Sequence, residues 1–176
     1  AFKAWAPIFM VRSFPEMDTA QAVFHGVFWF YLGAFIGVTL GGRISDVLKP
    51  RRAGIRFEVE FVGLALCIPF ILMMAYSQSL IWMIVAILMF GFATGVYDSN
   101  IYAALFDVIN PRFRAVGTGL FGCGGCIVGA FGPAVMGFLN DAFSPRVSMA
   151  SLAAFAIVGA LAILCARVFT FNKDKI

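Results

Sequence analysis

The sequence contains few charged residues. Asp, Glu, Lys and Arg make up 12% of its 176 residues, whereas soluble globular domains carry about 25%. Hydrophobic residues account for 62% of the chain, and the mean hydropathy is +0.95. A chain of this length with so little charge does not form a soluble core, so the composition predicts a membrane protein.

The sequence also lacks the residue groupings that support enzymatic or metal chemistry. It has no phosphate-binding loop, nucleophile elbow or HExxH motif, and its single histidine, His25, has no Cys or carboxylate at ligand spacing. Cys123 and Cys126 have redox-type spacing but lie in an apolar stretch, and we interpret them as small residues of a packed membrane helix. We therefore predict no enzymatic activity, no cofactor and no metal.

Long uncharged stretches occupy most of the chain. A membrane-spanning helix needs about 20 apolar residues; the stretch 61–97 is too long for one helix and divides at Ser77 to Ser79 into a helical hairpin. The first stretch is only half a span and does not begin with Met, so we expect a fragment that begins inside a helix. The predicted fold is an all-α, polytopic membrane bundle with helices at about 1–11 (partial), 20–42, 57–76, 80–108, 115–139 and 147–169.

The basic residues lie almost entirely at one end of these helices. Of the 13 Lys and Arg residues, all but Lys3, Arg12 and Arg146 fall in the loops after the second and fourth helices or in the C-terminal segment. Short cytoplasmic loops are enriched in Lys and Arg, so we expect these segments, including the C-terminus, to face the cytoplasm. The predicted location is the inner (plasma) membrane. The net charge of +4 follows from this asymmetry and does not indicate nucleic-acid binding.

A motif joins the second and third predicted helices. Residues 42–52 read GRISDVLKPRR, with one acid followed by paired bases. The pattern resembles the GxxxD…RR loop of the major facilitator superfamily, in the copy between its eighth and ninth helices. Val47 and Pro50 depart from the family pattern. The resemblance implies a latch that holds one conformation of the protein. The matching residues are Gly42, Asp46, Arg51 and Arg52.

Other stretches resemble the same family. Residues 110–119 are similar to the entry of its eleventh helix, and residues 132–141 are similar to the exit. Residues 5–10 (WAPIFM) resemble the end of its seventh helix, most closely in the organophosphate and organic-anion transporters. The resemblance covers the whole chain and implies the C-terminal half of a twelve-helix transporter, whose N-terminal half is then its partner. In that family the seventh and tenth helices line a central cavity.

Lys3 is a candidate substrate-binding residue. It lies about nine residues from the outer end of the first predicted helix, which at about 1.5 Å per residue places it about 13 Å deep. A charge at the bilayer centre costs at least about 2.5 to 3.5 kcal/mol. We therefore expect Lys3 either to bind an anionic substrate in the family's central cavity or to pair with an acid on a helix outside this sequence.

A second polar group lies in the fourth predicted helix. Asp98 shares a helical face with Tyr102, while Tyr97 and Asn100 belong to a neighbouring face. A carboxylate beside hydroxyls and an amide at membrane depth is typical of a substrate site or a proton-coupling site. The alternative is a structural acid paired with Lys3 or with a base elsewhere.

Two acids open the third predicted helix. Glu58 and Glu60 suit the positive end of the helix dipole, and Glu60 can pair with Arg56 one turn earlier. We interpret both as structural acids at the cytoplasmic surface.

These features predict a secondary active transporter of the major facilitator type that works by alternating access. We expect proton- or cation-coupled uptake of a small organic anion or sugar derivative, with the lipid bilayer, the N-terminal half, the substrate and its coupling ion as partners. One alternative is a membrane sensor of the same fold that binds such a ligand without net transport. Another is a structural half-bundle that scaffolds a complex. The predicted substrate-binding residues are Lys3, Tyr97, Asp98, Asn100 and Tyr102.

Overall fold

A computed structural model describes residues 2–170, and every regular element in that range is a helix. The elements are α1 (Phe2–Ser13), α2 (Thr19–Leu48), α3 (Ile55–Tyr76), α4 (Leu80–Asp98), α5 (Ile101–Val108), η1 (Pro111–Phe113), α6 (Arg114–Ala142), α7 (Pro145–Cys165) and η2 (Ala166–Thr170). The segments long and apolar enough to cross a membrane are Thr19–Leu48, Ile55–Tyr76, Leu80–Val108, Pro111–Ala142 and Pro145–Val168. The predicted all-α membrane bundle is therefore confirmed.

Local side chains set the starts of two of the long helices. Asp18 precedes α2, and its carboxylate accepts a hydrogen bond from the Ala20 N–H at 3.3 Å. Ser144 precedes α7, and its hydroxyl accepts from the Val147 N–H at 3.3 Å. Such caps satisfy N–H groups that the first helical turn leaves unpaired. Pro145 follows at the first position of α7, where a missing N–H costs nothing.

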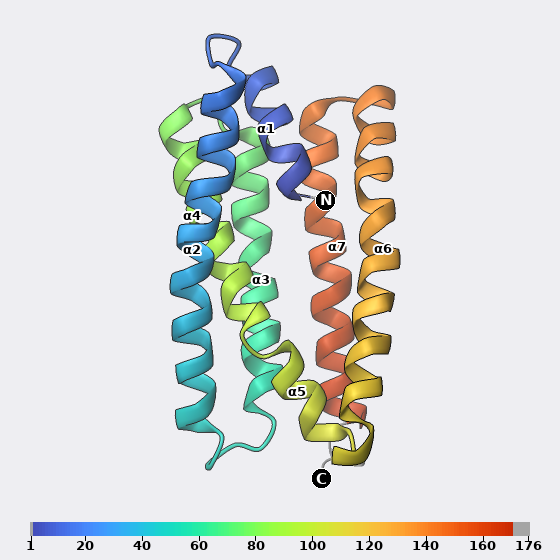
Figure 1. Cartoon of the computed structure of the whole chain (residues 1–176). Helices are drawn as coiled ribbons and strands as arrows, with labels where there is room; N and C mark the ends of the chain where they lie inside the picture. Colours follow the sequence, from blue (N-terminus) through green and yellow to red (C-terminus); the bar gives the residue numbers. More distant parts are fainter. Residues whose placement is uncertain (1, 171–176) are drawn as a thin grey trace.

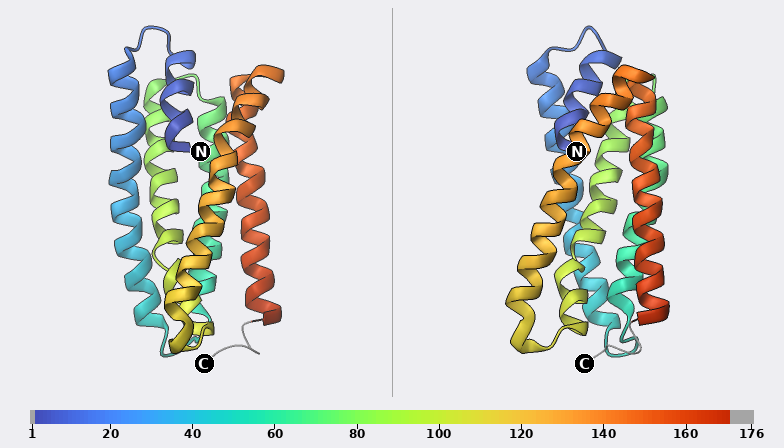
Figure 2. Two further views of the ribbon diagram at one scale, coloured as in Figure 1. Left: turned by 45° about the vertical axis from the view of Figure 1, so that its right-hand side comes forward. Right: turned by 90° about the vertical axis from the view of Figure 1, so that its right-hand side faces the viewer.

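The helices form a bundle with two different faces. In Figure 1, α1, α2, α5 and α6 lie toward the viewer, and α3 and α7 lie behind them. The right-hand view of Figure 2 shows the bundle from the side: α3 and α7 lie at one edge, and α6 runs obliquely from the other edge at its lower end to the top of α7. α1 occupies only the upper part of the bundle, away from the α2–α3 loop and η1.

α2 and α4 pack in close backbone contact. Two glycines of α2, Gly33 and Gly37, lie against the backbone of α4, and two glycines of α4, Gly91 and Gly95, lie against the backbone of α2. A Cβ atom at any of these positions would overlap a backbone carbonyl of the neighbouring helix. In lipid, helices approach this closely only where both carry small residues, so the glycine spacing fixes which faces of α2 and α4 meet.

α6, in contrast, is mostly uncovered. Its only buried residues are Met136 and Asn140, and a Cβ atom on Gly122 or Gly125 would meet nothing within 4 Å. Its exposed apolar residues include Val116, Leu120, Ile127, Val128, Phe131 and Phe138. This glycine-rich helix presents an open apolar face that the other described helices do not cover.

Candidate functional site

The Lys3 side chain extends from α1 to α2. Its Nζ donates a hydrogen bond to the Tyr31 hydroxyl at 2.9 Å, and it lies 4.7 Å from the centre of the Tyr31 ring and 5.5 Å from that of Phe30. Electron-rich ring faces and a hydroxyl stabilise an ammonium group where water is scarce. Within residues 2–170, no carboxylate lies within ion-pair distance of Lys3. Its positive charge is therefore stabilised but not neutralised.

Asp98, the last residue of α4, is exposed. It lies close enough to Lys3 for the two charges to interact, although no ion pair joins them in the described part of the chain. The fold thus brings two predicted site residues from distant parts of the sequence into one region. Both side chains are exposed, so a ligand outside this bundle can contact them.

The helix expected over 80–108 is interrupted between α4 and α5. Ser99 Oγ donates to the Val96 carbonyl at 2.7 Å and accepts from Asn100 Nδ2 at 2.8 Å. Side chains that bond the nearby backbone compete with the helical hydrogen-bond pattern, and here they accompany a turn at Ser99 and Asn100. Asn100 is only 1% exposed. It therefore holds this turn, whereas the sequence places it beside Asp98 as a substrate ligand.

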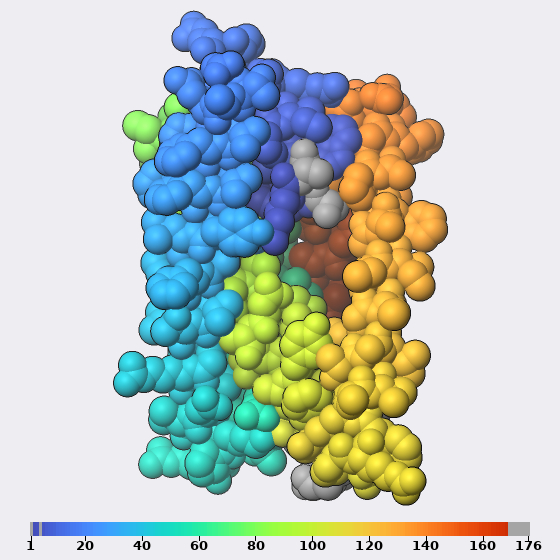
Figure 3. Space-filling view, in the orientation of Figure 1, coloured from blue at the N-terminus to red at the C-terminus, as the bar shows by residue number. Residues whose placement is uncertain are grey.

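The two predicted tyrosines take different positions. Tyr102 on α5 is 49% exposed, and its ring meets Phe121 of α6 edge to face, with 6.1 Å between ring centres. Tyr97 is half-buried and lines two mostly apolar cavities of about 350 and 290 Å³. Figure 3 shows the front of the molecule hollowed beside α6, with α7 at the back of the hollow. The Tyr102 side chain is therefore exposed at the surface of the bundle, as are those of Lys3 and Asp98. The Tyr97 side chain instead points toward the interior.

Glu60 of α3 lies in the smaller of these cavities. Its residue exposure is 6%, and its Oε1 atom has no hydrogen-bond partner within residues 2–170. The only other polar residue that lines this cavity is Tyr97. The expected pairing of Glu60 with Arg56 is absent, because the Arg56 guanidinium is held by carboxylates of α2 and α5 instead. Glu60 is thus a buried acid rather than a surface acid.

Charged side chains join the ends of α2, α3 and α5 at the basic end of the bundle. Asp107 of α5 accepts a hydrogen bond from Lys49 at 2.5 Å and from Arg56 at 2.9 Å. Arg56 also donates to the Ala103 carbonyl at 3.1 Å and lies 3.7 Å from Asp46. The side chains of Arg56 and Asp107 are only 17% and 15% exposed. Solvent therefore screens this pair less than it screens a surface pair.

The loop motif contributes Asp46 to this cluster. Its partner, Arg56, comes from outside the motif. Arg51 is exposed and has no ion-pair partner in the part of the chain that the structure describes. Gly42 is half-buried, and a Cβ atom there would meet nothing within 4 Å. Close packing within this bundle therefore does not require a glycine at position 42.

The remaining motif residue, Arg52, belongs to a second group of charges. Arg52 Nη1 lies 3.5 Å from Oε2 of Glu58, and Arg167 Nη2 lies 3.2 Å from Oε1 of the same acid. Glu58 therefore ties the start of α3 to η2. Asp46 and Arg52 serve different helix contacts although they are only six residues apart.

Asp107 is the acid that the sequence did not single out. The available signal is its position near the end of an apolar segment, on the side where basic residues gather. Which base it meets cannot be read from the sequence, because Lys49 follows α2 and Arg56 lies on α3, and the rotations of these helices are not encoded locally.

Comparison with known proteins gives one match. A family model described as Major Facilitator Superfamily matches residues 6–175. No curated protein matches the chain, and no solved structure matches it. The matched range takes in the loop motif at 42–52 and nearly the whole bundle.

Proposed function

The chain belongs to the Major Facilitator Superfamily, and from this premise we propose that it is half of a secondary active transporter for a small organic anion. Members of this family are transporters rather than enzymes. In this proposal α1 to α7 correspond to the family's last six helices, and the uncovered face of α6 contacts an N-terminal half. The substrate path lies between the halves, which rock to expose it to each side in turn.

The observation that carries the proposal is the environment of the Lys3 ammonium, which the Tyr31 hydroxyl and ring hold. The Lys3 ammonium is held by Tyr31 and the ring of Phe30 and lacks an ion-pair partner within the described residues. It is thus able to receive a carboxylate or phosphate group. Because the charges of Lys3 and Asp98 interact, a proton or cation bound at Asp98 strengthens the attraction of Lys3 for an anion. Such linkage is reciprocal and couples the two ligands.

We assign the conformational latch to the carboxylate of Asp107. The short helix α5 is joined to α4 by the Ser99–Asn100 turn, which gives the chain a point about which α5 can tilt. Lys49 and Arg56 hold the far end of α5 to α2 and α3. Breaking these pairs frees α5, while Asp46 offers Arg56 an alternative partner.

Uptake measurements test the proposal. The complete protein is reconstituted in vesicles with an imposed proton gradient, and uptake of a radiolabelled sugar acid or sugar phosphate is followed. We expect Lys3→Met to lower uptake at least tenfold and Asp98→Asn to remove its dependence on the gradient. Arg43→Gln is the matched control, because Arg43 is an exposed base with no ion pair within residues 2–170. Its uptake should equal that of the unaltered protein.

The same measurements distinguish the alternatives. Full gradient-driven uptake by both the Lys3→Met and Asp98→Asn variants contradicts the assigned site. Binding of the anion without net uptake by the unaltered protein favours a sensor of the same fold. A scaffolding half-bundle predicts that Lys3→Leu and Asp98→Leu leave the cellular function intact.

A further inference from the structure

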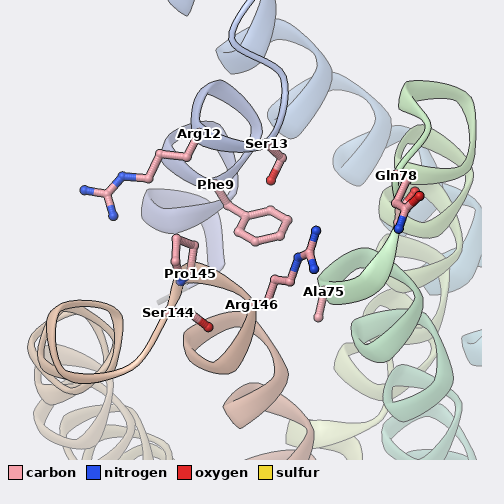
Figure 4. Close-up of a pocket in the computed structure, with 9 residues that line it drawn as sticks. Phe9, Arg12, Ser13, Ala75, Gln78, Ser144, Pro145 and Arg146 are labelled. Atoms are coloured by element: carbon pink, nitrogen blue, oxygen red, sulfur yellow. The ribbon is translucent and has the colours of Figure 1, made fainter.

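A polar cavity lies at the end of the bundle away from the basic loops. It has a volume of about 520 Å³ and is formed where α1 ends, α3 passes to α4 and α7 begins. Figure 4 shows Phe9 and Ala75 beside it. Binding cavities for small molecules have volumes of about 300 to 1,000 Å³, so this one has room for a ligand larger than water.

The charges at this cavity are all positive. Arg12 and Arg146 line it, and no Asp or Glu is among its lining residues. Both lie on the predicted outer side of the membrane, where Lys and Arg are scarce. The fold collects both at one place although they lie near opposite ends of the chain. Membrane orientation gives no reason for this arrangement.

The two arginines differ in their hydrogen bonding. Figure 4 shows the Arg146 side chain extending between Phe9 and Ala75, while Arg12 extends to the other side of Phe9. Arg12 Nη1 donates to Asn140 Oδ1 at 2.5 Å. Arg146 is exposed, and its guanidinium makes no hydrogen bond or ion pair within residues 2–170. A guanidinium group has five N–H donors in a fork that matches a carboxylate or phosphate, and those of Arg146 are available.

Neutral polar groups complete the lining. Ser13, Ser77, Gln78 and Ser144 all border the cavity. Ser77 Oγ donates to the Ser79 carbonyl and Ser144 Oγ accepts from the Val147 N–H, so each hydroxyl keeps bonding capacity. The Gln78 side chain makes no hydrogen bond within the described residues, and its amide both donates and accepts. This set suits the hydroxyls of a polar ligand.

We propose that this cavity binds an anion that also carries hydroxyls, with Arg146 as the charged ligand and Gln78 and the serines as hydroxyl partners. The site is separate from Lys3 and Asp98 and does not depend on the proposed transport function. The same chemistry occurs in a soluble sugar acid and in the headgroup of phosphatidylglycerol, so the test has one arm for each source.

The first arm is calorimetric titration of the complete protein with gluconate in neutral detergent. The second compares thermal unfolding in phosphatidylglycerol and phosphatidylcholine nanodiscs. We expect Arg146→Gln to weaken gluconate binding at least tenfold, or to remove the rise in unfolding temperature that phosphatidylglycerol produces. Arg43→Gln serves as the matched control and should change neither quantity, because Arg43 is an exposed base of α2 at the other end of the bundle.

The variants also identify the source and the site. An effect of Arg146→Gln in the gluconate arm assigns a soluble anion, and an effect confined to the nanodisc arm assigns a lipid headgroup. If Arg146→Gln matches the unaltered protein in both arms, the inference is overturned. If Lys3→Met abolishes gluconate binding while Arg146→Gln leaves both arms unchanged, the outer site is again rejected but the proposed transport site is retained.

Discussion

Arg56 of α3 and Asp107 of α5 lie 2.9 Å apart with most of both side chains buried. Lys49, the residue directly after α2, meets the same carboxylate at 2.5 Å, so one acid connects the ends of three helices at the basic end of the bundle. Removing one member of a buried charge group leaves the others without compensation, which costs more than the pair itself contributes. The acid at position 107 should therefore matter more to stability than the exposed acid of the loop motif.

Asp107→Asn should lower the free energy of unfolding by about 2 to 4 kcal/mol, because Lys49 and Arg56 would lose their shared carboxylate. The measurement is the thermal unfolding midpoint of the complete protein in detergent. Asp46→Asn is the control: its side chain is 75% exposed and lies 3.7 Å from Arg56, so its effect should stay within about 1 kcal/mol. Equal midpoints for the two variants would contradict the role given to Asp107.

Gly33→Ala should destabilise the protein by about 3 kcal/mol or more, because the new methyl group meets the Leu88 carbonyl of α4 and forces α2 away from it. Gly42→Ala on the same helix meets open space. It should be neutral or should stabilise by up to about 1 kcal/mol, because Ala favours the helix over Gly. Chemical unfolding followed by tryptophan fluorescence measures both. A milder effect at Gly33 than at Gly42 would rule out the close α2–α4 contact.

Glu60→Leu should leave the unfolding temperature unchanged or raise it at neutral pH. The reason is that Glu60 is 6% exposed and one of its carboxylate oxygens has no partner within residues 2–170; burying such a group costs free energy that Leu avoids. Glu58→Gln is the comparison, since Glu58 pairs with both Arg52 and Arg167, and its replacement should lower the temperature. A marked fall for Glu60→Leu would show that the acid has a stabilising partner.

The predicted orientation is tested with single cysteines in a background without the four native ones. Pro50→Cys lies in the α2–α3 loop among the basic residues, and Glu16→Cys lies in the α1–α2 loop at the other end. An impermeant thiol reagent added to intact cells should label the cysteine at position 16 and leave the one at position 50 unlabelled, because basic loops stay in the cytoplasm. The reverse labelling pattern would invert the topology.

Prediction from sequence succeeded for features that depend on composition along the chain. Uncharged length and apolar content identify helices that cross a membrane, since every backbone group must be satisfied within the segment. The segment predicted over 80–108 is long and apolar enough to cross a membrane, but the sequence did not indicate its interruption at Ser99 and Asn100, which side-chain hydrogen bonds accompany. The prediction that Glu60 is a surface acid was also wrong, because distance from the helix start says nothing about which face of the helix a residue occupies.

The sequence by itself determined the membrane setting, the all-α class and the resemblance to the family to which the chain belongs. Each of these depends on residues that are neighbours in the chain. Only the tertiary structure decided that Arg56 meets Asp107, that Lys3 meets Tyr31, and that Arg12 and Arg146 share a cavity. The physical reason is that these helices are apolar on nearly all sides. No amphipathic pattern marks their inner faces, so contacts such as those of Gly33 and Gly95 set their rotation and thereby choose which distant polar residues meet.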